Sequence, residues 1–404
     1  MPYYSRIPIY IIPVSNAVNA VLPPIWLPFR GALAEIILKD RLQYCEDVIM
    51  DHEHGMAIIS CDPGRAQWNT VMGPMYDPNP RGDIYVYDYA TKKSLRKLKL
   101  VGFPTTADFH PLGINFFRSQ GGALTRLFVV NHQRNGSTID IFDLHYAELQ
   151  LTFIMSICDH DHNILSPNAV APTSYTSFYV TNDHRFIPRL HHNLNIQETM
   201  RGLPLGWATF VEFGMERPKF STAATGIPFA NGIVVTPTGR EVIIASSTGR
   251  ELYVYDRDPE TNILSPCLER IPMVFAPDNL NFDCSLDVGD RTVFDSDGRF
   301  LRGLICAGHP SVPELMAMSR DPITHRAPSW VAEVRRGQGD DPAPCHAMPL
   351  SRKGPYYLST LYQSDGSHYP SSTTGAMDFK RRRLIVCGLY AEGILDIAWE
   401  DIGT

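Results

Sequence analysis

A short apolar strand pattern recurs six times along this chain of 404 residues, and this repetition constrains the fold more than any other feature. Each copy follows a turn, is rich in β-branched residues and ends in small or polar residues. The copies start 50 to 80 residues apart, which is the spacing of four-stranded blades with variable loops. The pattern therefore predicts a six-bladed β-propeller with a central tunnel. The copies are Met56–Cys61, Leu127–His132, Phe178–Asp183, Val242–Ser247, Leu304–His309 and Leu384–Leu389.

A second strand pattern follows most of these copies. It alternates with a period of two and closes on a turn residue, as a half-buried antiparallel strand does. Clear copies are Ile84–Asp88, Ile139–Asp143 and Leu252–Asp256, and weaker ones are Leu315–Ser319 and Ile394–Ala398. Long amphipathic helical patterns are scarce, and the chain holds 29 Gly and 32 Pro. These features predict an all-β chain built by radial repetition.

The N-terminal segment differs from the rest in composition. Residues 1–40 are apolar and rich in proline, and we expect the propeller to occupy residues 41–404. The prolines keep every apolar run below the roughly 18 residues that cross a bilayer. A charged start and a small-residue cleavage site, typical of signal peptides, are missing. We expect an extended arm packed over the domain; the alternative is an interfacial anchor that contacts a membrane surface, or a lip where the substrate enters.

Charge and cysteine usage restrict the partners and the compartment. The net charge is −7 and the largest basic run is Lys380–Arg383, so nucleic acid is not an expected partner. The eight cysteines are scattered, without C-x-x-C pairs or zinc spacing. Several stand inside apolar runs, such as Cys306 and Cys387. We interpret them as small buried hydrophobic residues of an intracellular, cytoplasmic protein.

Polar residues recur at the ends of the first strand pattern. We expect these six strands to run beside the tunnel, so that the polar side chains at their ends converge at one mouth. The residues are Asn131, His132, Asn182, Asp183, His184 and His309. Because polar residues recur at the same position of the repeated strand pattern, we predict a functional site at that mouth of the tunnel.

The chain resembles the serum paraoxonase/arylesterase family and, more distantly, the gluconolactonase and regucalcin-type propellers. The resemblance runs from residue 44 or so to the end, and its motifs occur in the family's order. The most specific are Thr181-Asn-Asp-His184 and Phe229-Ala-Asn-Gly-Ile233. The others are Glu46-Asp47, Val129-Val-Asn-His132, Ser137-Thr138, Pro167-Asn168, Asp278-Asn279 and Gly308-His-Pro310. The resemblance implies a calcium-dependent propeller that hydrolyses lactones and aryl esters.

By this resemblance, one Ca²⁺ in the tunnel has five protein ligands, namely Glu46, Asn168, Asn231, Asp278 and Asn279. The residue types themselves also fit a calcium site, because Ca²⁺ prefers oxygen ligands and two carboxylates balance its charge. Such a site can polarise a carbonyl group. The alternative is that these Asn and Asp residues only form turns. A second, structural ion is implied at Asp47, but Ala169 replaces the family's Asp, so we expect that ion to be weak or absent.

The resemblance also implies a pair of histidines that activates water. His132 matches one partner, whereas Leu112 stands at the other position. His110 lies two residues earlier, about 6.6 Å along a strand, and is not an automatic replacement. Asp183 and His309 match an Asp and a His that line the family's tunnel, and a carboxylate that orients an imidazole makes it a base. The predicted catalytic residues are His132, Asp183, His309 and Glu46, and the predicted substrate-binding residues are Phe229, His184, Leu112 and Leu389.

Three functions fit these features. The first is a calcium-dependent lactonase or arylesterase acting on a small apolar molecule. The second is a non-hydrolytic cyclase or pericyclase of secondary metabolism, of the Diels–Alder type, which Leu112 and Ala169 favour. The third is a binding propeller without catalysis. The family's disulfide between terminal cysteines has no counterpart, since its second position lies near Asp396, which agrees with an intracellular protein.

Overall fold

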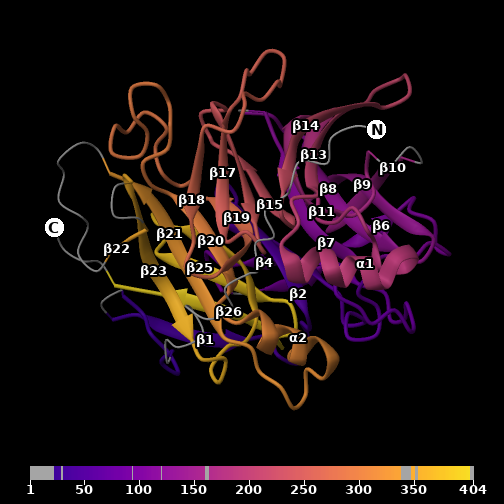
Figure 1. Cartoon of the computed structure of the whole chain (residues 1–404), viewed down its shortest axis with the longest axis horizontal. Helices are drawn as coiled ribbons and strands as arrows, with labels where there is room; N and C mark the ends of the chain where they lie inside the picture. The colour runs from indigo at the N-terminus through magenta and orange to yellow at the C-terminus, as the bar shows by residue number, and fades with distance from the viewer. Residues whose placement is uncertain are drawn as a thin grey trace, which may run out of the picture.

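The computed structural model describes residues 22–28, 31–92, 94–119, 121–159, 163–337, 347–350 and 354–400. In these ranges the strands pair into six sheets of four or five strands each. The prediction of an all-β, six-bladed propeller is confirmed. Figure 1 shows a molecule built almost entirely of strands, with the two helices outside the sheets.

Each sheet is one blade, in which the first-named strand borders the tunnel and the last lies outermost. The first blade is β2 (Cys45–Asp51), β3 (Met56–Cys61), β4 (Asp83–Asp88) and β5 (Leu95–Lys97). The second is β7 (Pro111–Phe117), β8 (Thr125–Gln133), β9 (Gly136–His145), β10 (Gln150–Ile157) and β6 (Lys99–Val101). The third is β11 (Pro167–Ser174), β12 (Ser177–Asn182), β13 (Gly206–Glu212) and β14 (Lys219–Ile227).

The other three blades follow the same order. The fourth is β15 (Ala230–Val235), β16 (Glu241–Ser246), β17 (Glu251–Asp256) and β18 (Glu269–Pro272). The fifth is β19 (Ala276–Phe282), β20 (Leu304–His309), β21 (Ser329–Arg336), β23 (Tyr356–Ser364) and β22 (Met348–Pro349). The sixth is β24 (Ser372–Asp378), β25 (Arg383–Gly388), β26 (Ile394–Ala398) and β1 (Leu33–Ile37).

The two ends of the chain close the ring together. The innermost strands β2, β7, β11, β15, β19 and β24 each contact the next, and β24 contacts β2. β1 pairs antiparallel with β26, so an N-terminal strand completes the last blade. The segment expected to be an arm therefore contributes residues 33–37 to the propeller. Its first 21 residues lie outside the described ranges, and the arm's role stays a prediction.

The six repeated patterns are the second strands of the blades, not the innermost ones. Each of these strands is buried along nearly its whole length, because blades cover both of its faces. For example, Ile243 and Leu252 of the fourth blade share one apolar cluster with Cys306 and Ala332 of the fifth. Our expectation that these strands border the tunnel is wrong. The innermost strands face a polar tunnel and therefore lack a continuous apolar run.

The weak strand pattern at Leu315–Ser319 is also a misreading, because it lies in helix α2 (Val312–Arg320). Ser311 caps this helix by accepting a hydrogen bond from the backbone N–H of Glu314, and a proline stands in the first turn. Serine followed by glutamate three positions later is a helix-start signal that outweighs a short alternation. The other helix, α1 (Pro188–Arg201), also begins at a proline. Neither described helix has the length and apolarity needed to cross a membrane.

The cysteines depart from expectation in burial and in pairing, since Cys158 and Cys284 are exposed and one pair is bonded. Cys45 and Cys61 face each other on β2 and β3 and form a disulfide. The expectation that the cysteines are unpaired hydrophobic residues is wrong for this pair, since adjacent antiparallel strands bring together positions that a sequence pattern does not connect. Cys306 and Cys387 are buried and free, as expected.

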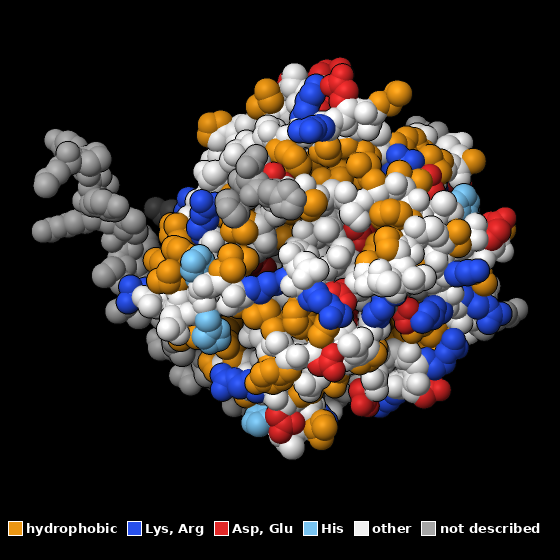
Figure 2. All heavy atoms as spheres, turned by 90° about the vertical axis from the view of Figure 1, so that its right-hand side faces the viewer, with side chains coloured by type: hydrophobic (Ala, Val, Ile, Leu, Met, Phe, Trp, Pro, Cys, Tyr) orange, Lys and Arg blue, Asp and Glu red, His pale blue; other side chains and the backbone are white. Residues whose placement is uncertain are grey.

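On the face drawn in Figure 2, basic and acidic side chains are intermixed with small hydrophobic groups.

Candidate functional site

All six innermost strands carry a β-bulge at the same depth. Pairing with the second strand shifts at Cys45/Asp47, Pro111/Ile114, Pro167/Val170, Ala230/Ile233, Pro277/Leu280 and Ser372/Thr374. A bulge leaves residues unpaired and redirects their side chains. The bulged residues include Glu46, Leu112, Asn168, Asn231, Asp278, Asn279 and Thr373. The five predicted metal ligands therefore stand in equivalent bulges of four blades.

Two glycines let neighbouring bulges approach each other. A Cβ atom at Gly232 would lie 2.6 Å from the carbonyl oxygen of Asp278. A Cβ atom at Gly113 would lie 2.4 Å from the carbonyl oxygen of Asn168. Since real Cβ atoms do not come this close to backbone, only glycine permits this packing. The glycine after Asn231 thus serves the spacing of the ligand strands.

A cavity of about 560 Å³ opens above these bulges. Glu46, Asn168, Asn231, Asp278 and His309 contribute part of its polar surface, and further polar residues line it near α1, α2 and the fourth blade. The predicted substrate-binding residues Leu112, Phe229 and Leu389 line it, and the remaining apolar walls come from the loop around residues 71–76 and from α1 and α2. A smaller space of about 330 Å³ lies among the opposite ends of the innermost strands. The cavity on the ligand side therefore combines polar groups with an apolar enclosure, as ligand sites do.

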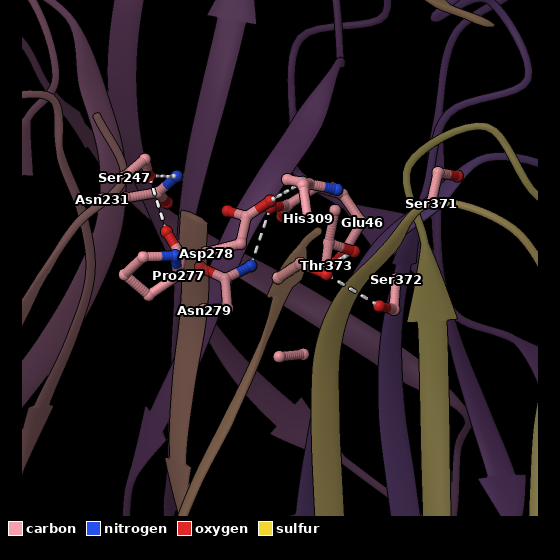
Figure 3. Close-up of polar contacts among 12 residues, drawn as sticks. Glu46, Asn231, Ser247, Pro277, Asp278, Asn279, His309, Ser371, Ser372 and Thr373 are labelled. Atoms are coloured by element: carbon pink, nitrogen blue, oxygen red, sulfur yellow. Dashed lines mark hydrogen bonds and ion pairs between the residues drawn. The ribbon is translucent and has the colours of Figure 1, made fainter. Parts of the chain in front are cut away.

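Four of the five predicted ligands present a buried oxygen with no hydrogen-bond donor among the described residues. These atoms are Glu46 Oε2, Asn168 Oδ1, Asn231 Oδ1 and Asn279 Oδ1. Figure 3 shows Glu46, Asn231, Asp278 and Asn279 grouped around the same region. Buried polar atoms without partners are rare and require an explanation, of which an ion is one. Oxygens gathered without donors fit a hard cation such as Ca²⁺.

The nitrogen end of each asparagine is held by a neighbour. Asn231 Nδ2 donates to Ser247 Oγ at 2.9 Å, and Ser247 Oγ donates to the Pro277 carbonyl at 2.6 Å. Asn279 Nδ2 donates to Glu46 Oε1 at 2.7 Å. The remaining anchor is Asn168 Nδ2, which donates to Asp183 Oδ2 at 3.2 Å. Because each amide is anchored through nitrogen, its oxygen is the end left for a ligand.

The electrostatics of Glu46 also favour a cation. Burial, together with the nearby carboxylates of Asp47 and Asp278, raises the pKa of Glu46 well above its usual range. Its ionised form is therefore unfavourable unless positive charge lies beside it. Among the described residues, no group of three or more His, Cys, Asp or Glu side chains is placed to hold a metal. The candidate site depends on amide oxygens as much as on carboxylates.

Asp47 has a different environment from its neighbour Glu46. Its oxygens accept hydrogen bonds from the backbone N–H groups of Val48 and Ile114, each at 2.8 Å, and from Thr374 Oγ1 at 3.1 Å. Burial raises the pKa of Asp47 to about 6 in spite of these donors. A carboxylate whose oxygens already accept hydrogen bonds from these donors does not fit a second cation.

His309 and Asp278 form a pair on the cavity wall. His309 Nε2 lies 2.7 Å from Asp278 Oδ2, and His309 Nδ1 has no partner among the described residues. Asp183, which we expected beside His309, is instead joined to His184 at 2.8 Å, and neither Asp183 nor His184 lines the cavity. The His184 ring packs edge-on against Phe229, with ring centroids 4.5 Å apart. His184 thus supports a cavity residue instead of facing the cavity.

His132 does not line the cavity. Its Nδ1 is 2.9 Å from Ser137 Oγ, and the Trp68 indole donates to its carbonyl oxygen at 2.9 Å. Burial, followed by the positive charges of Arg189 and Arg65, lowers the pKa of His132 well below its usual range. Nε2 of the neutral imidazole has no hydrogen-bond partner within the part of the chain that the structure describes. Its predicted catalytic role stays a prediction.

His110 does not occupy the place of Leu112. Leu112 lines the cavity, whereas His110 Nδ1 is buried 2.9 Å from Asp62 Oδ2. Ser247 and Asn195 were not predicted from the sequence, although both have polar side chains that line the cavity. Ser247 ends a recognised strand pattern, so its position was a usable signal. Asn195 lies on α1, and only the recognition of that helix would have revealed it.

The family model described as Arylesterase matches residues 54–294, which is more than half of the chain. The matched range includes Asn168, Asn231, Asp278 and Asn279, while Glu46 and His309 lie outside it. Serum paraoxonase/arylesterase 2 of Rattus norvegicus is 32% identical over 214 residues, 52% of this chain and 56% of that protein. Serum paraoxonase/arylesterase 1 of Mus musculus is 30% identical over 187 residues, 45% of this chain and 49% of that protein. These alignments span about half the length of the curated relatives.

Solved structures share the fold over nearly the whole chain. The pyrroloquinoline quinone (PQQ) domain of a pyranose dehydrogenase from Coprinopsis cinerea superposes with a TM-score of 0.52 at 10% identity, covering 93% of this chain and 97% of that one. A luciferin-regenerating enzyme superposes with a TM-score of 0.50 at 13% identity, covering 92% of this chain and 96% of that one. At such identities the likeness concerns the propeller architecture alone.

Proposed function

This chain belongs to the arylesterase family, and from that membership we propose that it is a calcium-dependent hydrolase of a small apolar lactone or aryl ester. The observation that carries the proposal is the set of four unpartnered oxygens in the bulges, beside the Asp278–His309 pair. Together these groups provide a place for a cation and a base within one cavity.

The residues proposed to hold the ion are Glu46, Asn168, Asn231, Asp278 and Asn279. When bound, Ca²⁺ would polarise the substrate carbonyl and stabilise negative charge on its oxygen. The chain's own residues keep these ligands in place, because Ser247 anchors Asn231 and Asp183 anchors Asn168. We propose this anchoring as the role of Asp183, which does not line the cavity.

His309 is the proposed general base. Its Nε2–H donates to Asp278 Oδ2 at 2.7 Å, which leaves the lone pair of Nδ1 free. Nδ1 would take a proton from the water that attacks the carbonyl carbon. The bond from that carbon to the ester oxygen then breaks, and the leaving oxygen receives a proton. The products are a carboxylic acid and an alcohol or phenol, which a lactone keeps in one molecule.

The cavity walls favour an apolar substrate. Leu112, Phe229 and Leu389 line the cavity, and flexible methionines from the loop, α1 and α2 complete the walls. These methionines are Met72, Met75, Met200 and Met316. Unbranched methionines adapt to differently shaped apolar groups. The cavity therefore matches a mostly apolar substrate whose one carbonyl group lies beside the bulged residues.

The test is the turnover of phenyl acetate and of γ- and δ-lactones, with added calcium and with EDTA. We expect calcium-dependent hydrolysis, and we expect His309→Gln to lower kcat/KM by about 100-fold or more, because removal of a general base typically costs about 10²- to 10⁴-fold. His325→Gln, an exposed histidine outside the cavity, is the matched control and should keep full activity. Absence of hydrolysis above background, or an unchanged rate in His309→Gln, would contradict the proposal and favour non-hydrolytic chemistry.

A further inference from the structure

The cavity wall formed by α1 holds a buried polar group that the proposed reaction does not use. We propose that Asn195 donates a hydrogen bond to the substrate and thereby selects esters or lactones that carry a second acceptor group, away from the scissile carbonyl. This inference rests on the proposed function, since it names the substrate class of the same cavity.

Asn195 has the features of an unfilled hydrogen-bonding position. Its side chain lines the cavity, the residue is 6% exposed, and its Nδ2 has no acceptor among the described residues. A buried amide group without a partner is unfavourable, so such groups are rare in folded proteins. A site that hydrogen-bonds a substrate group leaves its own donor unpaired until the substrate arrives.

The position of α1 does not depend on this side chain. The Glu198 carboxylate accepts hydrogen bonds from the backbone N–H groups of Arg185 and Phe186, both at 2.9 Å. Thr199 Oγ1 lies 2.7 Å from His184 Nε2 and donates to the backbone carbonyl of Asn195 at 3.0 Å. These contacts hold the inner face of the helix, so the Asn195 amide is available for a ligand.

Asn195 is on α1, whereas the proposed metal ligands are on the bulged innermost strands. Thr199 contacts His184, and the His184 ring packs on Phe229, which borders the cavity. A second unpartnered polar atom, Thr248 Oγ1, lines the same cavity next to Ser247. A ligand that reaches from the bulges to α1 can therefore contact both apolar Phe229 and the hydrogen-bond donor of Asn195. The matching substrate has a carbonyl at one end, an apolar middle and a second acceptor further along.

The experiment scans the position of that acceptor. Phenyl esters of straight acyl chains, each with one ketone at a successive carbon, are compared with all-methylene esters of the same length in the presence of calcium. For the best position, we expect wild type to prefer the keto ester by about 5- to 20-fold in kcat/KM, the worth of one hydrogen bond. In Asn195→Leu and Asn195→Asp the preference should fall to about one, while the methylene ester is hydrolysed within about threefold of wild type.

Asn193→Leu is the control, because Asn193 is exposed on the same helix and does not line the cavity; it should keep the preference. An equal preference in wild type and Asn195→Leu, or no preference at any position, overturns the inference. Equal losses for both esters would assign Asn195 a structural role and also overturn it.

Binding of non-hydrolysable ketones, in which CH₂ replaces the ester oxygen, separates this inference from the proposed function. If no ester is cleaved but wild type binds the diketone more tightly than the monoketone and Asn195→Leu does not, Asn195 recognises the acceptor while hydrolysis is disproved. If esters are cleaved but the diketone shows no such advantage, hydrolysis stands and the inference about Asn195 fails.

Discussion

At the scale of single residues, the asparagines of the tunnel differ from turn asparagines because one end of each amide is held and the other is not. Asn231 shows this most simply. Ser247 Oγ accepts from its Nδ2 and has its own hydrogen committed to the Pro277 carbonyl, so it acts only as an acceptor toward Asn231. The oxygen of Asn231 is thereby fixed in the direction of the proposed ion.

Ser247→Ala is expected to weaken calcium binding without unfolding the protein. Loss of the anchor frees the Asn231 amide to rotate, and loss of such supporting contacts typically lowers metal affinity about 10- to 100-fold. Titration with calcium against a competing chelator measures the change. Ser246→Ala is the control, because Ser246 donates to the Pro228 carbonyl at 2.6 Å and contacts none of the proposed ligands. Equal affinities in the two variants would show that Ser247 does not orient Asn231.

The sequence could predict the candidate ligands but not their supports. Asn231 and Asp278 belong to short motifs that can be recognised from residue order alone. Ser247 and Asn195 act through contacts with residues distant in the chain or through a helix that no sequence pattern indicated. His132 shows the converse: its strand-end position was recognised, yet the residue does not line the cavity.

At the scale of elements, the second strands were predictable and the innermost strands were not. Second strands such as β16 are buried on both faces and therefore read as continuous apolar runs. In β15, by contrast, Asn231 and Gly232 interrupt the pattern because they form the bulge. The shared depth of the six bulges depends on strand pairing, which a single sequence does not contain.

The junction between the fourth and fifth blades contains a buried carboxylate that should make stability depend on pH. Burial raises the pKa of Glu241 to about 7, although Phe300 N–H donates to it at 2.8 Å. The pKa of Glu241 in the folded protein lies above its usual value. Its protonated form therefore contributes fully to the free energy of unfolding below about pH 4.5, and this contribution is lost as pH rises through 7. Glu241→Gln should abolish this loss, which amounts to roughly 3 kcal/mol.

Melting curves of both proteins at pH 5 and pH 8 test this prediction. Between pH 5 and pH 8, the melting temperature of wild type should fall further than that of Glu241→Gln. Glu212→Gln, at an exposed position on β13, should behave like wild type. Parallel pH profiles for wild type and Glu241→Gln would mean that Glu241 is ionised as easily as an exposed glutamate.

At the scale of the whole molecule, the proposed ion would connect blades that are distant in sequence. Its ligands come from β2, β11, β15 and β19, which belong to the first, third, fourth and fifth blades. The second and outer strands of the fourth and fifth blades, for example, pack against each other in one apolar cluster. In the bulges of the four ligand-bearing blades, by contrast, oxygens of Glu46, Asn168, Asn231 and Asn279 have no donor among the described residues. The proposed ion would supply the partner that these oxygens lack among the described residues.

Removal of calcium should consequently destabilise the entire propeller. A ligand that binds only the folded state adds about 2.7 kcal/mol at 100 times its dissociation constant. We expect EDTA to lower the melting temperature by several degrees in one cooperative transition, because four blades share the ion. Asp278→Ala should melt at the lower temperature already and should no longer respond to EDTA, since it lacks one of the two carboxylates. Asp258→Ala, at an exposed position, is the control and should respond as wild type does. An unchanged melting curve of wild type in EDTA would mean that hydrogen bonds such as Asn279–Glu46 hold the tunnel without a cation.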